Sequence, residues 1–561
     1  MRKYSTKKAL ETNHEELAVF HPLQQALLVS RGVTTLEEAQ RFLQPSYDDH
    51  THDPLSILGM EKSVLRILEG MKKGERITIY SDYDHDGIPG GVVLHDFFKK
   101  VGYENFTNYI PHRYTEGYGL NIGAIEKLAA EGTTLLVTVD CGITDVQPVK
   151  RANELGLDVI ISDHHLPHGE LPPAFAILNS KQEDCAYAYD MLCGAAVAYK
   201  LVQALISKGN FNLIPGWEKW LLDLVGISTV ADMVPLTGEN RVFAHYGLKV
   251  LRKSPRPGLQ KLLRVMKMNQ NTITEDDIGF MIAPRINAAS RMGDPRLAFD
   301  LLSSSEEGAG EALAKELQKL NDTRKGVVAA MVKEMKHTIA SRERLSEVIV
   351  LGNPNWRPGL LGLAANTLVE EYNRPVFLWG REGGETLKGS CRSDGTVDLV
   401  KLMSAVPKHL FLEFGGHAAS GGFQVAQEYV YLLEEELSKA YMGVREERTT
   451  DEVVVDHILT LDEVNMGTWR AIEPLAPFGI GNPKPLFMLE HIIPEKARMF
   501  GKTGEHLELT FRKTNGDFVR AIEFFSTREV REREALTLIA NLERSTFGRY
   551  PEIRLRIVDV V

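Results

Sequence analysis

Three apolar runs in the first half of the chain each end in acidic or imidazole side chains. They are RITIYS before the acids of 82–86, TTLLVTV before Asp140, and DVIIS before the Asp-His-His of 163–165. Short apolar runs bounded in this way are typical of strands. The segments GGVVLHDFFKKVG and VQPVKRANELG, which follow the first two runs, have helical spacing. This alternation predicts an α/β domain with a doubly wound parallel sheet over residues 61–305.

Two further domains are predicted beyond that sheet. Residues 306–343 carry leucine, valine and methionine at helical steps, which predicts a long connector helix between two lobes. Runs such as SEVIVLGN and RPVFLWG predict a smaller α/β domain over 344–430. The charged segment REERTTDE marks a boundary, and period-two runs such as EIRLRIVDV predict a small β-barrel over 450–561. The polar, helical residues 1–60 are predicted to form an N-terminal appendage.

Composition excludes several classes of protein. The 561 residues are 43% hydrophobic and 25% charged, which is typical of a globular protein. No apolar run approaches the roughly 18 residues needed to span a bilayer, so no membrane partner is expected. The N-terminus is basic but has no apolar core of a signal peptide, and we expect a cytoplasmic protein. The four cysteines lack metal-binding spacing and are expected to be reduced thiols in a monomer.

The net charge of −11 leaves the substrate open. Nucleic-acid binding depends on where Lys and Arg cluster more than on their total number. A metal site built from carboxylates also contributes negative charges that its cations neutralise.

The acids of DYDHDG, Asp82, Asp84 and Asp86, predict a cation site at the end of the first strand. A calcium-binding EF-hand loop begins in the same way, but its twelfth residue is a bidentate Glu, and here it is Val93. A plain acidic turn is the alternative. Three carboxylates on alternate residues repel one another unless a cation lies between them, which favours metal.

The other acids and imidazoles differ in how specific they are. Asp140 precedes a predicted helix, so an N-cap role is as well supported as a metal ligand. Asp163, His164 and His165 form a more specific group, because adjacent imidazoles after an acid rarely serve packing. Mixed carboxylate and imidazole ligation favours Mn²⁺ over Mg²⁺. Asp232, in VADMVPL, follows an apolar helical stretch and alone would be interpreted as a helix cap.

The order DYDHDG, VDCG, DHH and VADMVPL resembles the DHH phosphoesterase superfamily. IPHRYTEGYGLN, LNSKQEDCAYAYDMLCGAAVAYKL and APRINAASRM are similar to segments of the bacterial RecJ family of single-strand-specific exonucleases. KGSCRS and FGGHAASGGF resemble the DHHA1 domain of that family, and PFGIGNPKPLF with the strands after it resembles its OB-type domain. The resemblance covers residues 60–561.

This resemblance implies roles for individual residues. The positions that match the two-metal ligands are Asp84, Asp86, Asp140, His164 and Asp232, with Asp140 bridging the cations. Asp82 and Asp163 match neighbouring acids that ligate or orient, and His165 matches the imidazole beside the scissile phosphate. The implied activity is two-metal hydrolysis of single-stranded DNA from 5′ to 3′ in repair and recombination. Mn²⁺ is the expected metal, with Mg²⁺ as the alternative, and a helicase and a single-strand-binding protein are the expected partners.

Substrate contacts are predicted in four segments of the chain. They are Arg113 and Tyr114, which would hold and stack the strand; Arg285, Asn287 and Arg291, which would contact the phosphate backbone; Ser390 and Arg392, which would bind a 5′ phosphate; and Gly415, Gly416 and His417, which would offer backbone N–H groups to an anion. A structural salt bridge is the alternative for the arginines of the second segment, and a tight turn is the alternative for the glycine-rich segment.

Three departures from the family pattern leave the pocket detail open: Pro89 and Gly90 after DG, His85 between two acids, and Arg357 in place of a histidine. Two other functions share the predicted ligands. One is a DHH phosphodiesterase for short oligonucleotides or cyclic dinucleotides, which has little use for a C-terminal barrel. The other is a non-catalytic scaffold, which would be expected to have lost ligand positions that are all filled here.

Overall fold

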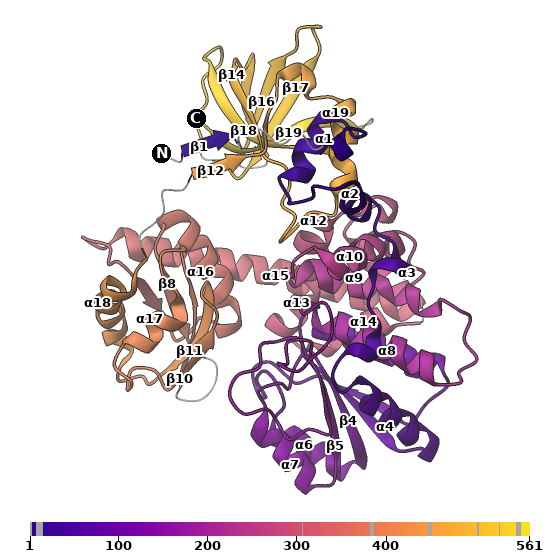
Figure 1. Ribbon diagram of the computed structural model, residues 1–561. Coiled ribbons are helices and arrows are strands. Elements are labelled where there is room, and N and C mark those ends of the chain that lie inside the picture. Colours follow the sequence, from indigo (N-terminus) through magenta and orange to yellow (C-terminus); the bar gives the residue numbers. More distant parts are fainter. Residues whose placement is uncertain are drawn as a thin grey trace.

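The computed structural model describes residues 3–6, 15–305, 307–381, 386–446, 452–501, 504–526, 528–545 and 551–561. Residue 306 and residues 450–451, where two of the predicted parts begin, lie outside this range. Figure 1 shows a purple first α/β domain, an orange second α/β domain and a yellow β-domain arranged around the long helix α15. Within the described residues, no helix combines the length and apolar character required to cross a membrane.

The first α/β domain is built on a five-stranded sheet in which every neighbouring pair is parallel. The strand order is β3-β2-β4-β5-β6, with bounds Phe106–Tyr109, Arg76–Ser81, Thr133–Val139, Asp158–Ser162 and Ala176–Leu178. This arrangement confirms the predicted parallel sheet. Because the strands share one direction, their carboxyl ends all lie at the same edge.

Helices cover both faces of this sheet, as a doubly wound fold requires. One face packs through side chains such as Ile79 and Val137 against α4, α5 and α8 (Met60–Lys73, Gly87–Lys100 and Gly194–Lys208). The other face packs through Leu136 and Ile161 against α6 and α7 (Ile122–Ala130 and Val146–Glu154). Further helices extend the first core, among them α9 (Leu222–Ala231), α10 (Gly238–Leu251), α13 (Ala283–Met292) and α14 (Arg296–Ser303).

Helix α15 spans Glu307–Ala340 and joins the two α/β domains (Figure 1). The second domain has a mixed sheet of order β10-β11-β9-β8-β7, with bounds Glu413–Gly416, Ser420–Val425, Leu387–Arg392, Val376–Gly380 and Ile349–Gly352. Helix α16 (Pro358–Tyr372) and the end of α15 cover one face of it, and α17 (Leu399–Ala405) and α18 (Leu433–Val444) cover the other.

The C-terminal part is a seven-stranded sheet that encloses one core. Its order is β13-β14-β18-β19-β17-β16-β15, with bounds His457–Ile458, Phe487–Ile492, Leu536–Ser545, Glu552–Val560, Phe518–Phe524, His506–Arg512 and Lys496–Phe500. Side chains such as Leu507 and Leu509, two residues apart on β16, are both buried in this core. The period-two pattern of the sequence reflects this half-buried sheet.

The N-terminal segment packs on the C-terminal domain. Leu23 and Leu27 of α1 (Pro22–Val29) lie in the core of that domain, and β1 (Lys3–Thr6) pairs with β12 (Glu452–Val455). Arg241 of α10 joins three parts of the chain at this point. Its guanidinium stacks on Phe42 and donates hydrogen bonds to the carbonyls of Phe42 at 2.7 Å and Leu475 at 3.0 Å. The joint fixes the β-domain against the first α/β domain.

Candidate metal centre

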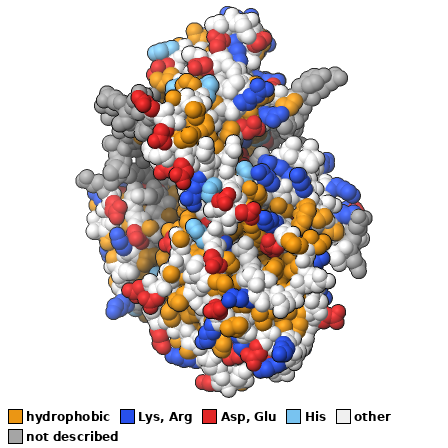
Figure 2. Space-filling model, turned by 45° about the vertical axis from the view of Figure 1, so that its right-hand side comes forward, with side chains coloured by type: hydrophobic (Ala, Val, Ile, Leu, Met, Phe, Trp, Pro, Cys, Tyr) orange, Lys and Arg blue, Asp and Glu red, His pale blue; other side chains and the backbone are white. Residues whose placement is uncertain are grey.

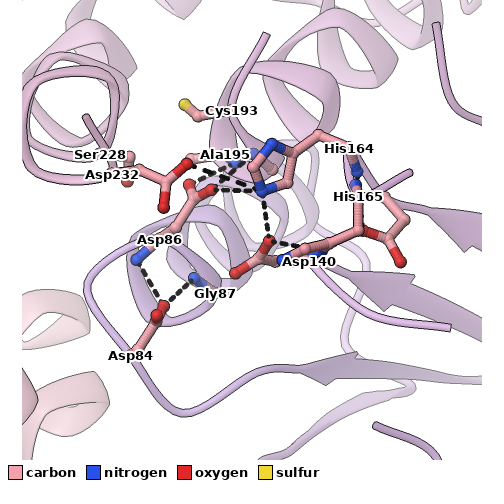
Figure 3. A network of polar contacts seen from close by, with 12 residues as sticks. Asp84, Asp86, Gly87, Asp140, His164, His165, Cys193, Ala195, Ser228 and Asp232 are labelled. Carbon is pink, nitrogen blue, oxygen red and sulfur yellow. Dashed lines mark hydrogen bonds and ion pairs between the residues drawn. The ribbon is translucent and has the colours of Figure 1, made fainter. Parts of the chain in front are cut away.

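The carboxyl edge of the first sheet gathers the predicted acids and imidazoles. Asp82, Asp84 and Asp86 follow β2, Asp140 follows β4, and the 163–165 segment follows β5. Asp232 joins them from the C-terminal end of α9. Figure 3 shows Asp86, Asp140, His164 and Asp232 pointing toward one another from separate segments of the chain.

His164 lies at the centre of the first group of possible ligands. Its Nε2 is 3.1 Å from Asp140 Oδ1, 3.6 Å from Asp86 Oδ2 and 3.7 Å from Asp232 Oδ2 (Figure 3). Asp86, His164 and Asp232 each offer one ligand atom within 4.8 Å of the others. This spacing suits a single cation between them.

A second group lies beside the first. Asp82, Asp84 and Asp140 also bring one oxygen each within 4.8 Å of one another. Asp140 is therefore in reach of both groups. The backbone of Asp140 has a positive φ of 64°, and the next helix begins later, at Val146 behind the N-cap position of Asp145. The N-cap interpretation of Asp140 was wrong, because the chain makes a tight turn between the strand and that helix.

Two of the acids are anchored by the N-termini of helices. Both oxygens of Asp86 accept hydrogen bonds from the first turn of α8, from Gly194 N at 2.6 Å and Ala195 N at 2.8 Å. Asp84 accepts from Asp86 N and Gly87 N at the start of α5. Helix N-termini stabilise negative charge, so these contacts hold two carboxylates in place.

Burial and repulsion between carboxylates disfavour the charged form of the other acids of the centre, Asp140, Asp232 and Asp82. Burial, and then the carboxylates of Asp86 and Asp84, raises the pKa of Asp140 well above its ordinary value, and the same causes raise the pKa of Asp232 to about 9. Burial, and then Asp84, raises the pKa of Asp82, whose Oδ1 is buried without a hydrogen-bond partner among the described residues. Crowded carboxylates of this kind and an imidazole are the donors that divalent cations prefer, so the site fits such ions.

Asp163 and His165 form a separate pair at the edge of the centre. Asp163 Oδ1 accepts from the backbone N–H of both histidines and lies 2.8 Å from His165 Nδ1, while its Oδ2 accepts from Ile143 N. Because both oxygens are engaged, Asp163 orients the loop. His165 can also be grouped with Asp140 and His164 as a ligand, but its Nδ1 is already bonded to Asp163, and we favour the orienting pair.

A cavity of about 660 Å³ opens beside this pair and extends to the second α/β domain. Tyr83 and Tyr118 line it near the metal centre, and Lys388, Phe414 and Gly415 line it on the far side. Tyr118 links the cavity to the centre, since its hydroxyl donates to Asp140 O at 3.1 Å and lies 3.2 Å from His165 Nδ1. The cavity, whose lining also includes the acids Asp145 and Glu413, therefore adjoins the metal centre through Tyr118.

The comparisons with known proteins agree with this geometry. The DHH family N-terminal domain matches residues 76–229, the DHHA1 domain matches 345–441, and the RecJ OB domain matches 455–559. The single-stranded-DNA-specific exonuclease RecJ of Haemophilus influenzae is 31% identical over 90% of this chain and 89% of its own length. The chain belongs to the RecJ family.

Two other members of the RecJ family are also similar to this chain, one in sequence and one in structure. The exonuclease RecJ of Bacillus subtilis is 36% identical, and the match covers 88% of this chain but only 61% of that longer protein. The crystal structure of RecJ in complex with Mn²⁺ from Thermus thermophilus has a TM-score of 0.83 with 26% identity and covers 100% of this chain and 79% of that one. The predicted architecture of two α/β domains, connector helix and OB domain is thereby confirmed.

Some of the substrate residues expected from the RecJ resemblance lie at the cavity between the lobes. Arg113 and Tyr114 line it, and the Arg113 guanidinium lies 4.9 Å from the centre of the Tyr83 ring. Arg291 is half-buried beside them, and its Nη1 donates to Gly359 O at the start of α16. Tyr114 in turn donates to Arg291 O. These contacts tie the DHH domain to the DHHA1 domain at the cavity wall.

Arg285 and Asn287 are not among the residues that line this cavity. Positions 285 and 287 are about 200° apart around a helix, so they cannot both face one ligand. Arg285 donates to Gln318 Oε1 of α15 and to Met281 O. Asn287 Oδ1 accepts from His85 N, and its Nδ2 lies 2.7 Å from His85 Nδ1. His85, one of the departures from the family pattern, is therefore held against α13 through its main-chain N–H and its Nδ1.

The other departures have simple structural roles. Gly90 lies where α5 crosses the sheet, and a Cβ there would be 2.6 Å from Val139 Cγ1 and 3.0 Å from Ala195 Cα. Pro89 is buried in the first turn of the same helix, where a missing N–H is tolerated. Arg357 is exposed immediately before α16.

The expected phosphate-binding residues of the DHHA1 domain lie on paired strands. Arg392 Nη1 donates to Ser390 Oγ at 3.1 Å and to Cys391 O at 2.7 Å. In the described part of the chain, no carboxylate forms an ion pair with Arg392, and burial lowers its pKa. Gly415 and Gly416 pair with Gly422 and Gly421, which leaves bare backbone at this surface, and the exposed His417 follows in the turn.

Sequence reasoning missed three polar residues around the centre. Tyr118 bonds to both Asp140 and His165, while Asn179 and Lys181 bond to the backbone of the DHH loop. All three lie in segments that carried the resemblance, GYGLN and LNSKQ, but a lone Tyr, Asn or Lys has no periodic signature. Their convergence is visible only once the strands are placed.

Proposed function

We propose that this chain is a metal-dependent exonuclease that hydrolyses single-stranded DNA from the 5′ end. The observation that carries the proposal is the cluster of buried acids and His164 at the sheet edge. Tyr118 joins this cluster to a cavity whose lining includes aromatic and basic side chains. Membership of the RecJ family and the fold shared with the Mn²⁺ complex of the Thermus protein support it.

The chain's own residues divide the chemistry between them. Asp86, His164 and Asp232 would hold one divalent cation and Asp82 and Asp84 the other, with Asp140 shared. Cations bound there supply charge neutralisation of the phosphate and acidify an attacking water. His165, held by Asp163 through Nδ1, presents its other ring nitrogen as an acid–base group. Mn²⁺ is the proposed ion because an imidazole completes the donor set.

The cavity suits a single strand in particular. Unpaired bases expose their faces, and proteins recognise them by stacking on aromatic rings beside cationic groups. Tyr83, Tyr114 and Phe414 supply rings, and Arg113 and Lys388 supply charge. Lys388 and Gly389 of β9 line the far side of the cavity, and Ser390 and Arg392 follow on the same strand. The Ser390 hydroxyl and the Arg392 guanidinium, which has no acidic partner among the described residues, suit the 5′ phosphate.

The first prediction concerns direction. With Mn²⁺, a 3′-labelled single strand with a 5′ phosphate should give a ladder of shortened labelled products. A 5′-labelled strand should release its label in the first step. Blunt duplex DNA should not be hydrolysed, whichever end carries the label. Replacing Arg392 with Met should slow the 5′-phosphorylated strand by roughly 10-fold and leave a 5′-hydroxyl strand nearly unchanged, because a charge-assisted hydrogen bond contributes about 1.5–3 kcal/mol.

The same assay separates the alternative functions. Degradation confined to very short oligonucleotides would support a small-substrate phosphodiesterase and contradict the proposal. If neither long nor short oligonucleotides were hydrolysed with any divalent cation, the result would support a non-catalytic scaffold and contradict the proposal. Shortening of the 3′-labelled strand from its labelled end would refute the proposed polarity.

The outer face of the OB domain offers a second contact for the strand. Phe518 and Phe524 lie on this face of β17, 55% and 37% exposed, and arginines lie over both rings: Arg512 at 5.0 Å and Arg556 at 4.1 Å. Asp276 of the DHH domain acts electrostatically on Arg556, so this face lies near the catalytic domain. The visible face of the molecule in Figure 2 intersperses acidic and basic side chains, so local clusters matter more than the net charge.

We expect Phe518→Ala with Phe524→Ala to weaken binding of a long single strand by at least about 10-fold, since stacking contributes about 1–3 kcal/mol per base. Hydrolysis of a dinucleotide, which is too short to reach the OB domain, should be unchanged. Tyr431→Ala, an exposed aromatic on the DHHA1 domain, is the matched control. Fluorescence anisotropy at several salt concentrations measures binding, and equal losses on long and short substrates would contradict the second contact.

The remaining parts of the proposal concern the cellular setting. The cysteines that the structure describes are all free thiols, which supports a reducing, cytoplasmic compartment. We propose that the enzyme acts as a monomer on strands exposed by a helicase, with a single-strand-binding protein as a further partner, in DNA repair and recombination.

A further inference from the structure

The loop that carries both histidines is held by a neighbouring segment. This loop follows β5, and residues 179–181 follow the adjacent strand β6. Asn179 Nδ2 donates to His165 O at 2.8 Å, and Lys181 Nζ donates to His164 O at 2.5 Å. Each histidine therefore has its main-chain carbonyl bonded to a side chain from the same short segment.

Residues 179–182, called the bracing segment below, are themselves held by hydrogen bonds. Asn179 is fully buried, and its Oδ1 accepts from Lys181 N at 2.8 Å, which leaves Nδ2 free to donate to the loop. Gln182 closes the segment, since its Nε2 donates to Ile177 O and Asn179 O. The Gln182 side chain thus bonds within its own segment, and it supports that segment without taking part in the metal centre.

We infer that Asn179 and Lys181 are positioning residues of this centre. Lys181 fixes the peptide of His164 and so aims its Nε2 at the cation position shared with Asp86 and Asp232. Asn179 fixes the peptide of His165 and so keeps its ring beside Asp163. Loss of either donor leaves a carbonyl of the loop unpaired and lets the peptide rotate, which displaces the ring from its ligand geometry.

The charge of Lys181 makes the two possible roles of this residue distinguishable. Asp163 and Asp232 lie within electrostatic range of its ammonium group. An ammonium near a cation site repels the cation, so removing the charge alone would tighten cation binding. Removing the brace would weaken it, because residues that orient a ligand contribute about 10–100-fold to metal affinity. The sign of the change therefore reports which role dominates.

The decisive experiment measures Mn²⁺ binding to the full chain by the electron paramagnetic resonance signal of free Mn²⁺. Lys181→Met should raise the dissociation constant by about 10-fold or more, and Lys181→Arg should retain most of the affinity because it keeps a donor. Lys208→Met, at the C-terminal end of α8 where Lys208 pairs with Glu61, is the matched control with unchanged affinity. Unchanged or tighter binding in Lys181→Met would overturn the inference.

Asn179 gives an independent readout. Asn179→Asp keeps the oxygen that accepts from Lys181 N but loses the donor to His165 O. We expect kcat on a short single strand to fall about 10-fold with KM and Mn²⁺ affinity nearly unchanged, and an equal loss in Mn²⁺ affinity would refute the division of roles. The kcat measurement rests on the proposed function, whereas the Mn²⁺-binding measurement does not. A wild-type chain without nuclease activity would refute the proposed function, and the Mn²⁺ titrations would still test the roles of Asn179 and Lys181. If Lys181→Met fails to fold, weak Mn²⁺ binding by a folded Lys181→Arg would overturn the inference.

Discussion

Replacing Asp140 with Asn should lower kcat for single-strand hydrolysis on the order of 10³-fold or more, which corresponds to about 4 kcal/mol of transition-state stabilisation. Asp140 is the acid that reaches both groups of ligands, so its charge serves both cation positions. Asn is the appropriate replacement because it tolerates the positive φ of 64° at this position. A gel assay with labelled oligonucleotides in Mn²⁺ measures the loss.

The same variant has an expected effect on stability. The raised pKa of Asp140 means that ionising it opposes folding as the pH rises above the ordinary range of an aspartate, with no cation bound. At a pH of about 8 without metal, Asp140→Asn should therefore unfold at a temperature equal to or above that of the wild type. The rise in Tm that Mn²⁺ produces in the wild type should largely disappear, because a ligand stabilises only as far as it binds.

Asp158→Asn is the matched control for this prediction. Asp158 begins β5 at the opposite end of the same sheet, where it pairs with Arg66. Its replacement should leave turnover and the Mn²⁺ response near those of the wild type. Near-normal turnover in Asp140→Asn, or an undiminished rise in Tm with Mn²⁺, would remove Asp140 from the metal centre.

The pattern of the sequence was sufficient to predict the sheet and the edge that carries the chemistry. Apolar runs predicted β2, β4 and β5, and parallel strands necessarily bring their carboxyl ends together. The acids directly after those strands therefore met as expected. Asp140 illustrates the limit of this approach. The sequence predicted a strand and then a helix but did not show where the helix begins, and in the structure a tight turn separates Asp140 from the helix start at Val146.

Side-chain direction and long-range packing could not be predicted in the same way. Arg285 and Asn287 share a motif with Arg291, but helix geometry directs the first toward α15 and the second toward His85. The residues of α1 gave no sign that Leu23 and Leu27 would be buried in the C-terminal domain, at the other end of the sequence. Lys181 carried no signal because its function depends on a carbonyl of another loop.

Replacing His165 with Ala should lower kcat by roughly 10²–10⁴-fold, the usual range for a general acid–base group, while Mn²⁺ affinity stays close to that of the wild type. The reason is that Nδ1 of His165 is bonded to Asp163 at 2.8 Å and lies 3.2 Å from the Tyr118 hydroxyl, so this nitrogen is not free for a cation. His168→Ala is the control, since His168 is exposed a few residues further along the same loop.

Asp163→Asn should cause a loss of the same order as His165→Ala, because an amide has a single acceptor oxygen. It cannot serve both Ile143 N on one side and the two histidine N–H groups with His165 Nδ1 on the other. The double variant should be hardly worse than either single one, since residues that act as a unit have non-additive effects. Steady-state kinetics with all three variants, together with Mn²⁺ titrations, test this. A fall in Mn²⁺ affinity that matches the fall in kcat for His165→Ala would make His165 a metal ligand, as its proximity to Asp140 and His164 allows. Strictly additive losses would mean that Asp163 acts elsewhere in the centre.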